Sequence, residues 1–142
     1  MKDQVDGLLV QNIPAALINS TLTQAEFNKT MYEVRSGKIK LLYIAPERLG
    51  SNFFCNVLRA LPIAQVIVDE AHCISEWGHD FRPSYRLIGE WLNSLPKRPI
   101  VGAFTATATK YVENDIKKLL GLDNANVYVT GFDRPNLSFS VI

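Results

Sequence analysis

Hydrophobic residues along the chain recur in two alternating patterns: short β-branched runs and longer amphipathic stretches. The short runs have the length and composition of strands. The strands expected from them are 15–19, 39–45, 64–69, 100–104 and 126–132. The amphipathic stretches place apolar residues three or four positions apart, as helices do. The helices expected from them are 2–12, 24–36, 52–61, 84–94 and 108–120. Such alternation favours an α/β fold, a parallel sheet with helices on both faces.

Start and stop signals stand at the ends of these elements. Thr23 and Glu26 have the spacing of a capping box, in which each side chain bonds the backbone of the other residue at a helix start. Gly37 and Gly121 are expected to end the helices before them, because glycine adopts the left-handed backbone of a helix C-terminus without strain. Pro14 is expected to stop the first helix at the residue before it.

Composition is typical of a globular protein. The 142 residues, 47% hydrophobic and 20% charged, suffice for one domain with a core. The net charge of +1 neither requires nor excludes a nucleic-acid partner, so a basic patch would have to be local. No apolar run approaches the about 18 residues of a membrane span, and no membrane partner is expected. Cys55 and Cys73 form no disulfide-rich pattern, which favours a reducing intracellular location, in the cytoplasm or in the nucleoid if the protein is bacterial.

Two carboxylates follow the strand expected at 64–69. Three β-branched residues lead directly into Asp69 and Glu70, which indicates a buried parallel strand with its charges at the C-terminal tip. Ligands of open α/β sheets bind outside such tips. One carboxylate with nucleotide phosphates is a typical shell for Mg²⁺, and a second could orient or deprotonate a water molecule. An isolated pair is more often a solvated strand end, but the buried strand and the Ala71-His72 that follows favour the functional interpretation.

A stretch dense in aromatic and basic side chains comes next. Its members are His72, Trp77, His79, Phe81, Arg82, Tyr85 and Arg86. Aromatic faces stack on bases of any sequence and arginine binds phosphate, so the stretch suits single-stranded nucleic acid. Two alternatives stay open: Trp77 and Tyr85 could pack under the loop, and His72, Cys73 and His79 could bind zinc, although zinc usually needs three or four well-spaced ligands.

Several motifs in this sequence together resemble one family. Asp69-Glu70-Ala71-His72 resembles the DEAH form of the Walker B motif of superfamily 2 helicases. The segment 73–85, called here the aromatic-rich loop, is similar to the loop of that name in RecQ-family DNA helicases. Other segments resemble that family's motifs Ia, Ib and III and the end of its first lobe, namely 1–4, 45–49, 104–108 and 132–137. The resemblance covers essentially the whole chain and implies an incomplete RecA-like P-loop NTPase lobe.

The resemblance implies a role for each matched residue. Asp69 would hold the Mg²⁺ of Mg-ATP and Glu70 would position the hydrolytic water. His72 would lie between the nucleotide and motif III, where Thr105 and Thr107 relay the nucleotide state toward DNA. Contacts with DNA are implied for Trp77, His79, Phe81, Arg82, Tyr85 and Arg48, and Arg134 is a further candidate for DNA-backbone or interlobe contacts.

The phosphate-binding motif Gly-x-x-x-x-Gly-Lys-Ser/Thr does not occur in these 142 residues. Gly37-Lys38 is followed by Ile39 and precedes a strand, which is the wrong context. In the family that the chain resembles, the P-loop segment lies upstream of the matched part, and a second RecA-like lobe completes the enzyme. We therefore expect 1–142 to be a first lobe without its P-loop segment, with that segment and the second lobe as partners.

The function implied is a part of an ATP-dependent 3′–5′ DNA helicase, which acts on single-stranded and duplex DNA in repair and recombination. The chain alone is expected to be inactive as an ATPase. The alternative is a stand-alone module that binds single-stranded DNA or another partner and has lost the motor. Without the P-loop strand, the edges at 100–104 and 126–132 would be unpaired, and self-association through them is expected.

Overall fold

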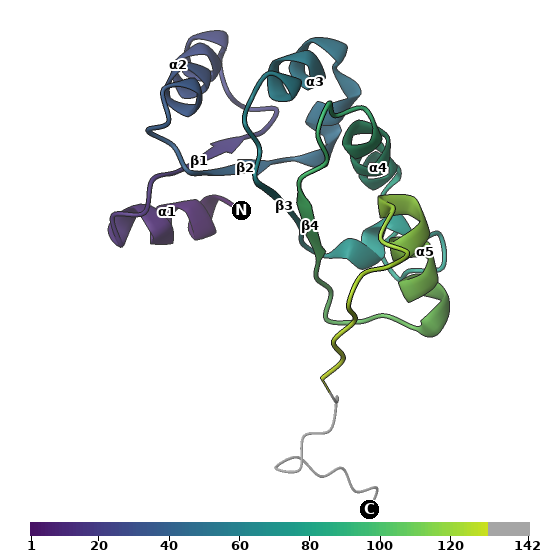
Figure 1. The fold of residues 1–142 in the computed structure, drawn as a ribbon. Helices are drawn as coiled ribbons and strands as arrows, with labels where there is room; N and C mark the ends of the chain where they lie inside the picture. The colour runs from purple at the N-terminus through teal and green to yellow at the C-terminus, as the bar shows by residue number, and fades with distance from the viewer. Residues whose placement is uncertain (131–142) are drawn as a thin grey trace, which may run out of the picture.

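The elements of the fold alternate along the chain as the sequence predicts (Figure 1). The computed structural model describes residues 1–130. Its α-helices are α1 (Lys2–Val10), α2 (Gln24–Arg35), α3 (Asn52–Arg59), α4 (Arg86–Asn93) and α5 (Lys110–Leu120). Its strands are β1 (Ala15–Ile18), β2 (Leu41–Ile44), β3 (Gln65–Val68) and β4 (Ile100–Ala103). Short 3₁₀ helices lie at Pro46–Gly50, Ala71–Ile74 and Pro83–Tyr85. None of the described helices is long and apolar enough to cross a lipid bilayer.

The strands pair in parallel, which confirms the α/β class. β1 pairs with β2, from Ala15 beside Leu41 to Ile18 beside Ile44. β3 pairs with β4 from Gln65 beside Ile100. Within residues 1–130 the pairing forms two two-stranded sheets, because no strand ladder joins β2 to β3. The single sheet expected from the alternation is therefore divided in two.

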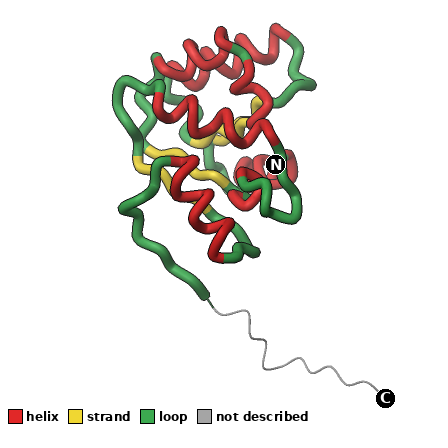
Figure 2. The backbone as a smooth tube through the Cα atoms, turned by 90° about the vertical axis from the view of Figure 1, so that its right-hand side faces the viewer, coloured by secondary structure: helices red, strands yellow, loops and turns green. Residues whose placement is uncertain are grey.

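Helices cover the sheets unequally. α1 and α2 lie on opposite sides of the β1–β2 pair, whereas α4 and α5 lie together beside the β3–β4 pair (Figures 1 and 2). One core joins side chains from β1 and β3 with side chains from helices α2 to α5. Its fully buried large side chains include Ile18, Phe54, Leu58, Ile74, Leu92 and Leu120.

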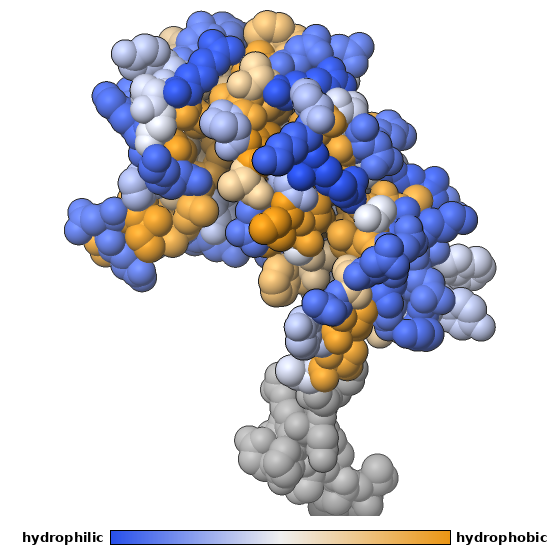
Figure 3. All heavy atoms as spheres, viewed as in Figure 1, coloured by the Kyte–Doolittle hydropathy of each residue, from blue (hydrophilic) through white to orange (hydrophobic). Residues whose placement is uncertain are grey.

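The burial predicted for β3 is wrong on one face. Val68 is 4% exposed, but Ile67, on the opposite face, is 52% exposed. A Cβ on Gly102 of β4 would contact the side chains of both Ile67 and Phe104, so these residues share that face. Hydrophobic atoms lie at the surface over β3 and β4 in Figure 3. The face is exposed because no described helix packs against it, and a strand is buried on both sides only where both faces are covered.

Most elements are a few residues shorter than predicted, and two of the differences have a clear physical reason. Residues 126–130 form no strand, because no neighbouring strand supplies the backbone hydrogen bonds that a strand requires; the rest of that expected strand and the turn at 133–136 lie outside the described residues. Ala108 precedes α5 and is exposed, since Thr109 caps this helix by accepting a hydrogen bond from the Val112 N–H.

The predicted caps are confirmed. Thr23 and Glu26 form the reciprocal capping box at the start of α2. Gly37 and Gly121 have φ of 72° and 63°, in the left-handed region that glycine enters without strain. These local signals were therefore sufficient to place the helix ends.

Candidate functional site

The two carboxylates lie where β3 and β4 end side by side. Phe104 N–H donates to the Val68 carbonyl, and Ala71 N–H donates back to the Phe104 carbonyl, each at 2.8 Å. These bonds hold the segment after β3 against the segment after β4. Asp69 and Glu70 are both exposed at this tip, and Asp69 Oδ1 accepts the Glu70 N–H at 2.9 Å.

Glu70 has an uncommon backbone conformation. Its φ of 48° and ψ of 43° are left-handed, a region that non-glycine residues rarely occupy. The turn directs the chain from β3 into the 3₁₀ helix Ala71–Ile74, all four residues of which are buried. Outliers of this kind concentrate at functional sites, where the surrounding structure holds them in place.

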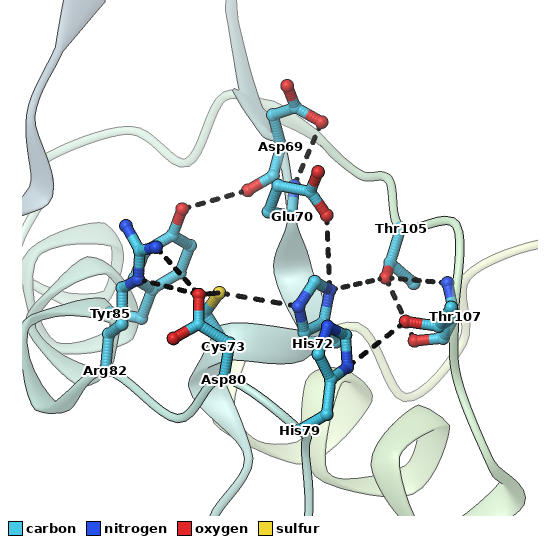
Figure 4. A network of polar contacts seen from close by, with 10 residues as sticks. All are labelled: Asp69, Glu70, His72, Cys73, His79, Asp80, Arg82, Tyr85, Thr105 and Thr107. Carbon is cyan, nitrogen blue, oxygen red and sulfur yellow. Dashed lines mark hydrogen bonds and ion pairs between the residues drawn. The ribbon is translucent and has the colours of Figure 1, made fainter.

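His72 connects the carboxylate tip to the β4–α5 segment (Figure 4). Its ring is buried, and Nδ1 lies 2.8 Å from Thr105 Oγ1 and 3.3 Å from Glu70 Oε2. The Thr105 hydroxyl donates to the Thr107 carbonyl at 3.1 Å. Since that hydroxyl has one proton, it accepts from His72, and the network assigns a proton to Nδ1. The structure thus brings together the residues expected to relay nucleotide state.

His79 joins the same network from the aromatic-rich loop. Its ring stacks on that of His72, with centroids 4.2 Å apart and planes 16° from parallel. Its Nδ1 lies 3.4 Å from Thr107 Oγ1. Two histidines therefore contact two threonines across the same junction. Across residues 1–130 no three His, Cys, Asp or Glu side chains are grouped so as to hold a metal ion, and the zinc interpretation gains no support.

Arg82 is held by a carboxylate of its own loop. Its Nε and Nη2 lie 3.1 and 2.7 Å from Asp80 Oδ2. Hydrogen bonding to Arg82 lowers the pKa of Asp80, and the same contact raises the pKa of Arg82. Cys73, buried beneath this pair, has its thiol pKa raised by desolvation. These bonds use Nε and Nη2, so the exposed guanidinium keeps further N–H donors with which it can bind a phosphate.

The aromatic residues of the loop differ in exposure. Trp77 is 79% exposed, so the packing interpretation is wrong for this residue. That interpretation fits Tyr85, which is half-buried, donates its hydroxyl to the Asp69 carbonyl at 3.3 Å and has its pKa raised by burial. Phe81 is half-buried, with the Arg86 guanidinium 5.3 Å from its ring centroid. Arg86 in turn pairs with Glu76 at 2.8 Å.

Arg48 is separated from this cluster. Its guanidinium carbon lies 5.5 Å from the ring centroid of Phe27 and 5.3 Å from that of Phe54. The neighbouring Glu47 is the residue that reaches the loop, because its Oε1 accepts a hydrogen bond from Ser84 Oγ at 3.1 Å. No local pattern in the sequence indicates this contact, because Glu47 and Ser84 are 37 positions apart. Arg134 lies outside the described residues, so its role stays a prediction.

An open cavity of about 290 Å³ lies between the strand tip and the aromatic-rich loop. Its lining residues are Glu70, His72, Cys73, His79, Asp80, Arg82, Tyr85, Ala106 and Thr107. Carboxylate, imidazole, guanidinium and hydroxyl groups therefore face one space. The arrangement can bind an anionic ligand at the side of Arg82 and a cation at the side of the carboxylates.

Comparison with known proteins agrees with this geometry. Residues 3–115 match the DEAD/DEAH box helicase family model, and the chain belongs to that family. It is 48% identical over 142 residues to the ATP-dependent DNA helicase RecQ of Bacillus subtilis, and it covers 24% of that protein. It is 42% identical over 142 residues to RecQ of Pasteurella multocida, with 22% of that protein covered. In both comparisons 100% of this chain is aligned.

More distant similarity extends to eukaryotes. The chain is 41% identical over 145 residues to the bifunctional 3′-5′ exonuclease/ATP-dependent helicase WRN of Mus musculus, with 99% of the chain and 10% of that protein aligned. The resemblance to RecQ helicases is thereby confirmed along the whole chain. The chain spans about a quarter of the length of the RecQ proteins it matches.

Proposed function

We propose that this chain is part of an ATP-dependent 3′–5′ DNA helicase of RecQ type, which couples ATP hydrolysis to unwinding of duplex DNA in repair and recombination. The observation that carries the proposal is the contact of His72 with Thr105. It joins the carboxylate tip to the motif III segment, and the contact of His79 with Thr107 adds the aromatic-rich loop to the same polar network. A motor needs such a connection, because hydrolysis at one place must change the hold on DNA at another.

ATP and Mg²⁺ fit the strand tip on chemical grounds. Mg²⁺ prefers carboxylate oxygens and commonly takes only one or two from the protein, and both side chains at this tip are exposed. When bound, Mg-ATP supplies the phosphoryl group whose hydrolysis drives the motor. Asp69 would bind Mg²⁺, and Glu70 would orient the attacking water. His72 would fix the positions of Glu70 and Thr105 relative to each other, because its Nδ1 contacts both.

The lobe is proposed to be completed by other parts of the same enzyme. A P-loop segment would supply the lysine and backbone amides that hold the phosphates, and a second RecA-like lobe would close over the nucleotide. The chain by itself should therefore hydrolyse no ATP. Self-association of the isolated chain is proposed through β4, which has β3 as its one strand neighbour among residues 1–130.

DNA is proposed to bind at the aromatic-rich loop. Trp77 offers an exposed ring for base stacking, which is worth about 1–3 kcal/mol per base. Phe81, His79 and Tyr85 would complete the aromatic surface. Arg82 would bind a phosphate through the N–H groups that Asp80 does not occupy. Arg48 is proposed as a weaker candidate for a DNA-backbone contact, because its guanidinium lies over the rings of Phe27 and Phe54.

The experiment is a fluorescence anisotropy titration of labelled oligo(dT) with the purified chain at two salt concentrations. Binding should weaken at high salt and in Trp77→Ala and Phe81→Ala. Tyr32→Ala is the matched control, because Tyr32 is an exposed aromatic residue on α2. Equal binding by all four proteins would refute the role of the loop.

The second candidate is a stand-alone module that binds single-stranded DNA. It is favoured by one observation: the aromatic-rich loop is held by contacts made within residues 1–130. The two functions are separated by an assay of ATP hydrolysis. The assay uses a polypeptide that contains this chain together with the rest of the enzyme. Glu70→Gln should abolish hydrolysis by the helicase and leave DNA binding by a module unchanged.

A further inference from the structure

A buried hydroxyl connects the aromatic-rich loop to helix α5. Ser75 has no exposed surface, and its Oγ donates to Asp115 Oδ2 at 2.6 Å. The same Oγ accepts the Trp77 N–H at 3.2 Å. Ser75 therefore holds the backbone of the exposed tryptophan on one side and a carboxylate of α5 on the other.

We propose that Ser75 and Asp115 form a positioning pair, which fixes the aromatic-rich loop to α5 so that Trp77 is oriented for DNA. This inference rests on the proposed function, because the pair matters for DNA only if the aromatic-rich loop binds DNA. Neither residue touches DNA in the proposal. Both act through the backbone of Trp77.

The loop has few other means of holding Trp77 in place. The indole ring is 79% exposed, so side-chain packing contributes little to its orientation. Its backbone is held by the bond to Ser75 Oγ and by the adjacent turn, in which Gly78 N–H donates to the Ser75 carbonyl at 3.0 Å. Both bonds end on Ser75, so the position of Ser75 determines that of the tryptophan.

The hydrogen bond from Ser75 to Asp115 is short, at 2.6 Å. A carboxylate that accepts from a hydroxyl forms a charge-assisted bond, shorter and stronger than a neutral one. Glu113, the other acid of α5, is paired with Lys110 and Lys117. Asp115 thus binds the aromatic-rich loop, whereas Glu113 forms ion pairs within α5.

The pair also completes a set of contacts between the same two segments. His72 contacts Thr105, His79 contacts Thr107, and Ser75 contacts Asp115. The threonines lie just before α5, which begins at Lys110. A displacement of the threonine segment would therefore carry α5 with it and move Trp77 through Ser75.

Hydrogen exchange measured by mass spectrometry on the whole chain tests the linkage without DNA. Asp115→Ala should accelerate exchange of the amides at 76–80 roughly tenfold, as expected when a local opening becomes easier. Asp115→Asn should restore part of the protection, because its amide oxygen still accepts from Ser75 in a bond without the charge. Asn114→Ala, at an exposed neighbouring position on α5, is the matched control. Amides within α5 should be unchanged in all variants.

Ser75→Ala is the second variant, in case Asp115→Ala folds poorly. It removes the hydroxyl without adding volume and should accelerate the same amides. Unchanged exchange at 76–80 in Asp115→Ala or Ser75→Ala would overturn the proposal. Loss of protection in Asp115→Asn equal to that in Asp115→Ala would also overturn it, because the charge rather than the hydrogen bond would then be responsible.

Oligo(dT) titration of the same proteins separates this inference from the proposed function. Asp115→Ala should weaken binding several-fold, Asp115→Asn should weaken it less, and Asn114→Ala should bind as the unmodified chain does. Faster exchange with unchanged DNA affinity would make the pair merely structural and overturn the inference. If the unmodified chain binds no oligo(dT), the DNA role of the loop fails, and the exchange data still decide whether the pair fixes the loop.

Discussion

His72 Nδ1 lies 2.8 Å from Thr105 Oγ1, although 33 residues separate them in the chain. This contact connects the segment after β3 to the segment after β4, beside the backbone bonds between Phe104, Val68 and Ala71. The two strand ends therefore behave as one unit. A substitution on either side of the contact should therefore alter the structure on the other side.

Thr105→Val should weaken this unit. Valine keeps the volume of threonine but removes the hydroxyl, which leaves Glu70, among residues 1–130, as the acceptor near Nδ1 of His72. The free energy of unfolding should fall by about 1 kcal/mol, the net value of a typical hydrogen bond. Urea unfolding followed by circular dichroism measures it. Thr130→Val, at an exposed position outside the network, should have no effect.

Gly78→Ala should displace the aromatic-rich loop. A Cβ at this position would lie 2.5 Å from the His72 carbonyl oxygen, closer than such atoms approach. We expect weaker oligo(dT) binding and a loss of about 1–3 kcal/mol in stability. Gly7→Ala on α1 is the control, because nothing lies within 4 Å of its Cβ and alanine favours a helix. Retention of full DNA affinity in Gly78→Ala would contradict the prediction.

Gly89→Ala should destabilise the packing of α4 against α5. The added Cβ would overlap the backbone carbonyl of Leu119, which cannot rotate away as a side chain could. We expect a loss of at least about 1–3 kcal/mol in the free energy of unfolding, measured by urea denaturation. A stability equal to that of the original chain would show that the two helices separate more easily than this packing implies.

The capping box of α2 should make stability depend on pH. Hydrogen bonds from Thr23 lower the pKa of Glu26 below its ordinary value of 4.5. Because the folded pKa is below the unfolded one, this contribution is present at neutral pH and is lost as the pH falls through the folded pKa. Thr23→Ala should cost about 1 kcal/mol at neutral pH and less in acid. Thr23→Ser keeps the cap and should retain the pH dependence in unfolding curves.

Self-association should proceed through the β3–β4 pair. Ile100 is exposed at the start of β4, on a strand with one described neighbour. Ile100→Lys should shift sedimentation at high protein concentration toward the monomer, because a charge on an open strand opposes further pairing. Val10→Lys, at an even more exposed apolar position on α1, should leave the distribution unchanged. A chain that is monomeric without substitution would exclude this mode of association.

Local signals were sufficient to predict several features from the sequence. The capping box of Thr23 and Glu26 and the left-handed Gly37 and Gly121 each depend on residues a few positions apart. The strand that precedes Asp69 was predicted for the same reason, because its composition and its sharp polar end are contiguous. Interactions within a few residues are encoded directly in the order of side chains.

Tertiary structure alone decided which distant side chains meet. The pairs His72–Thr105 and Ser75–Asp115 span 33 and 40 positions. Nothing in the sequence distinguishes Ser75 from any other serine in a loop. The exposure of Ile67 likewise depends on which helices cover the sheet. A β-branched run has the same sequence whether one face of its strand is covered or both. The sequence by itself thus determined the elements and the order of the motifs, whereas the contacts that unite the motifs required the folded chain.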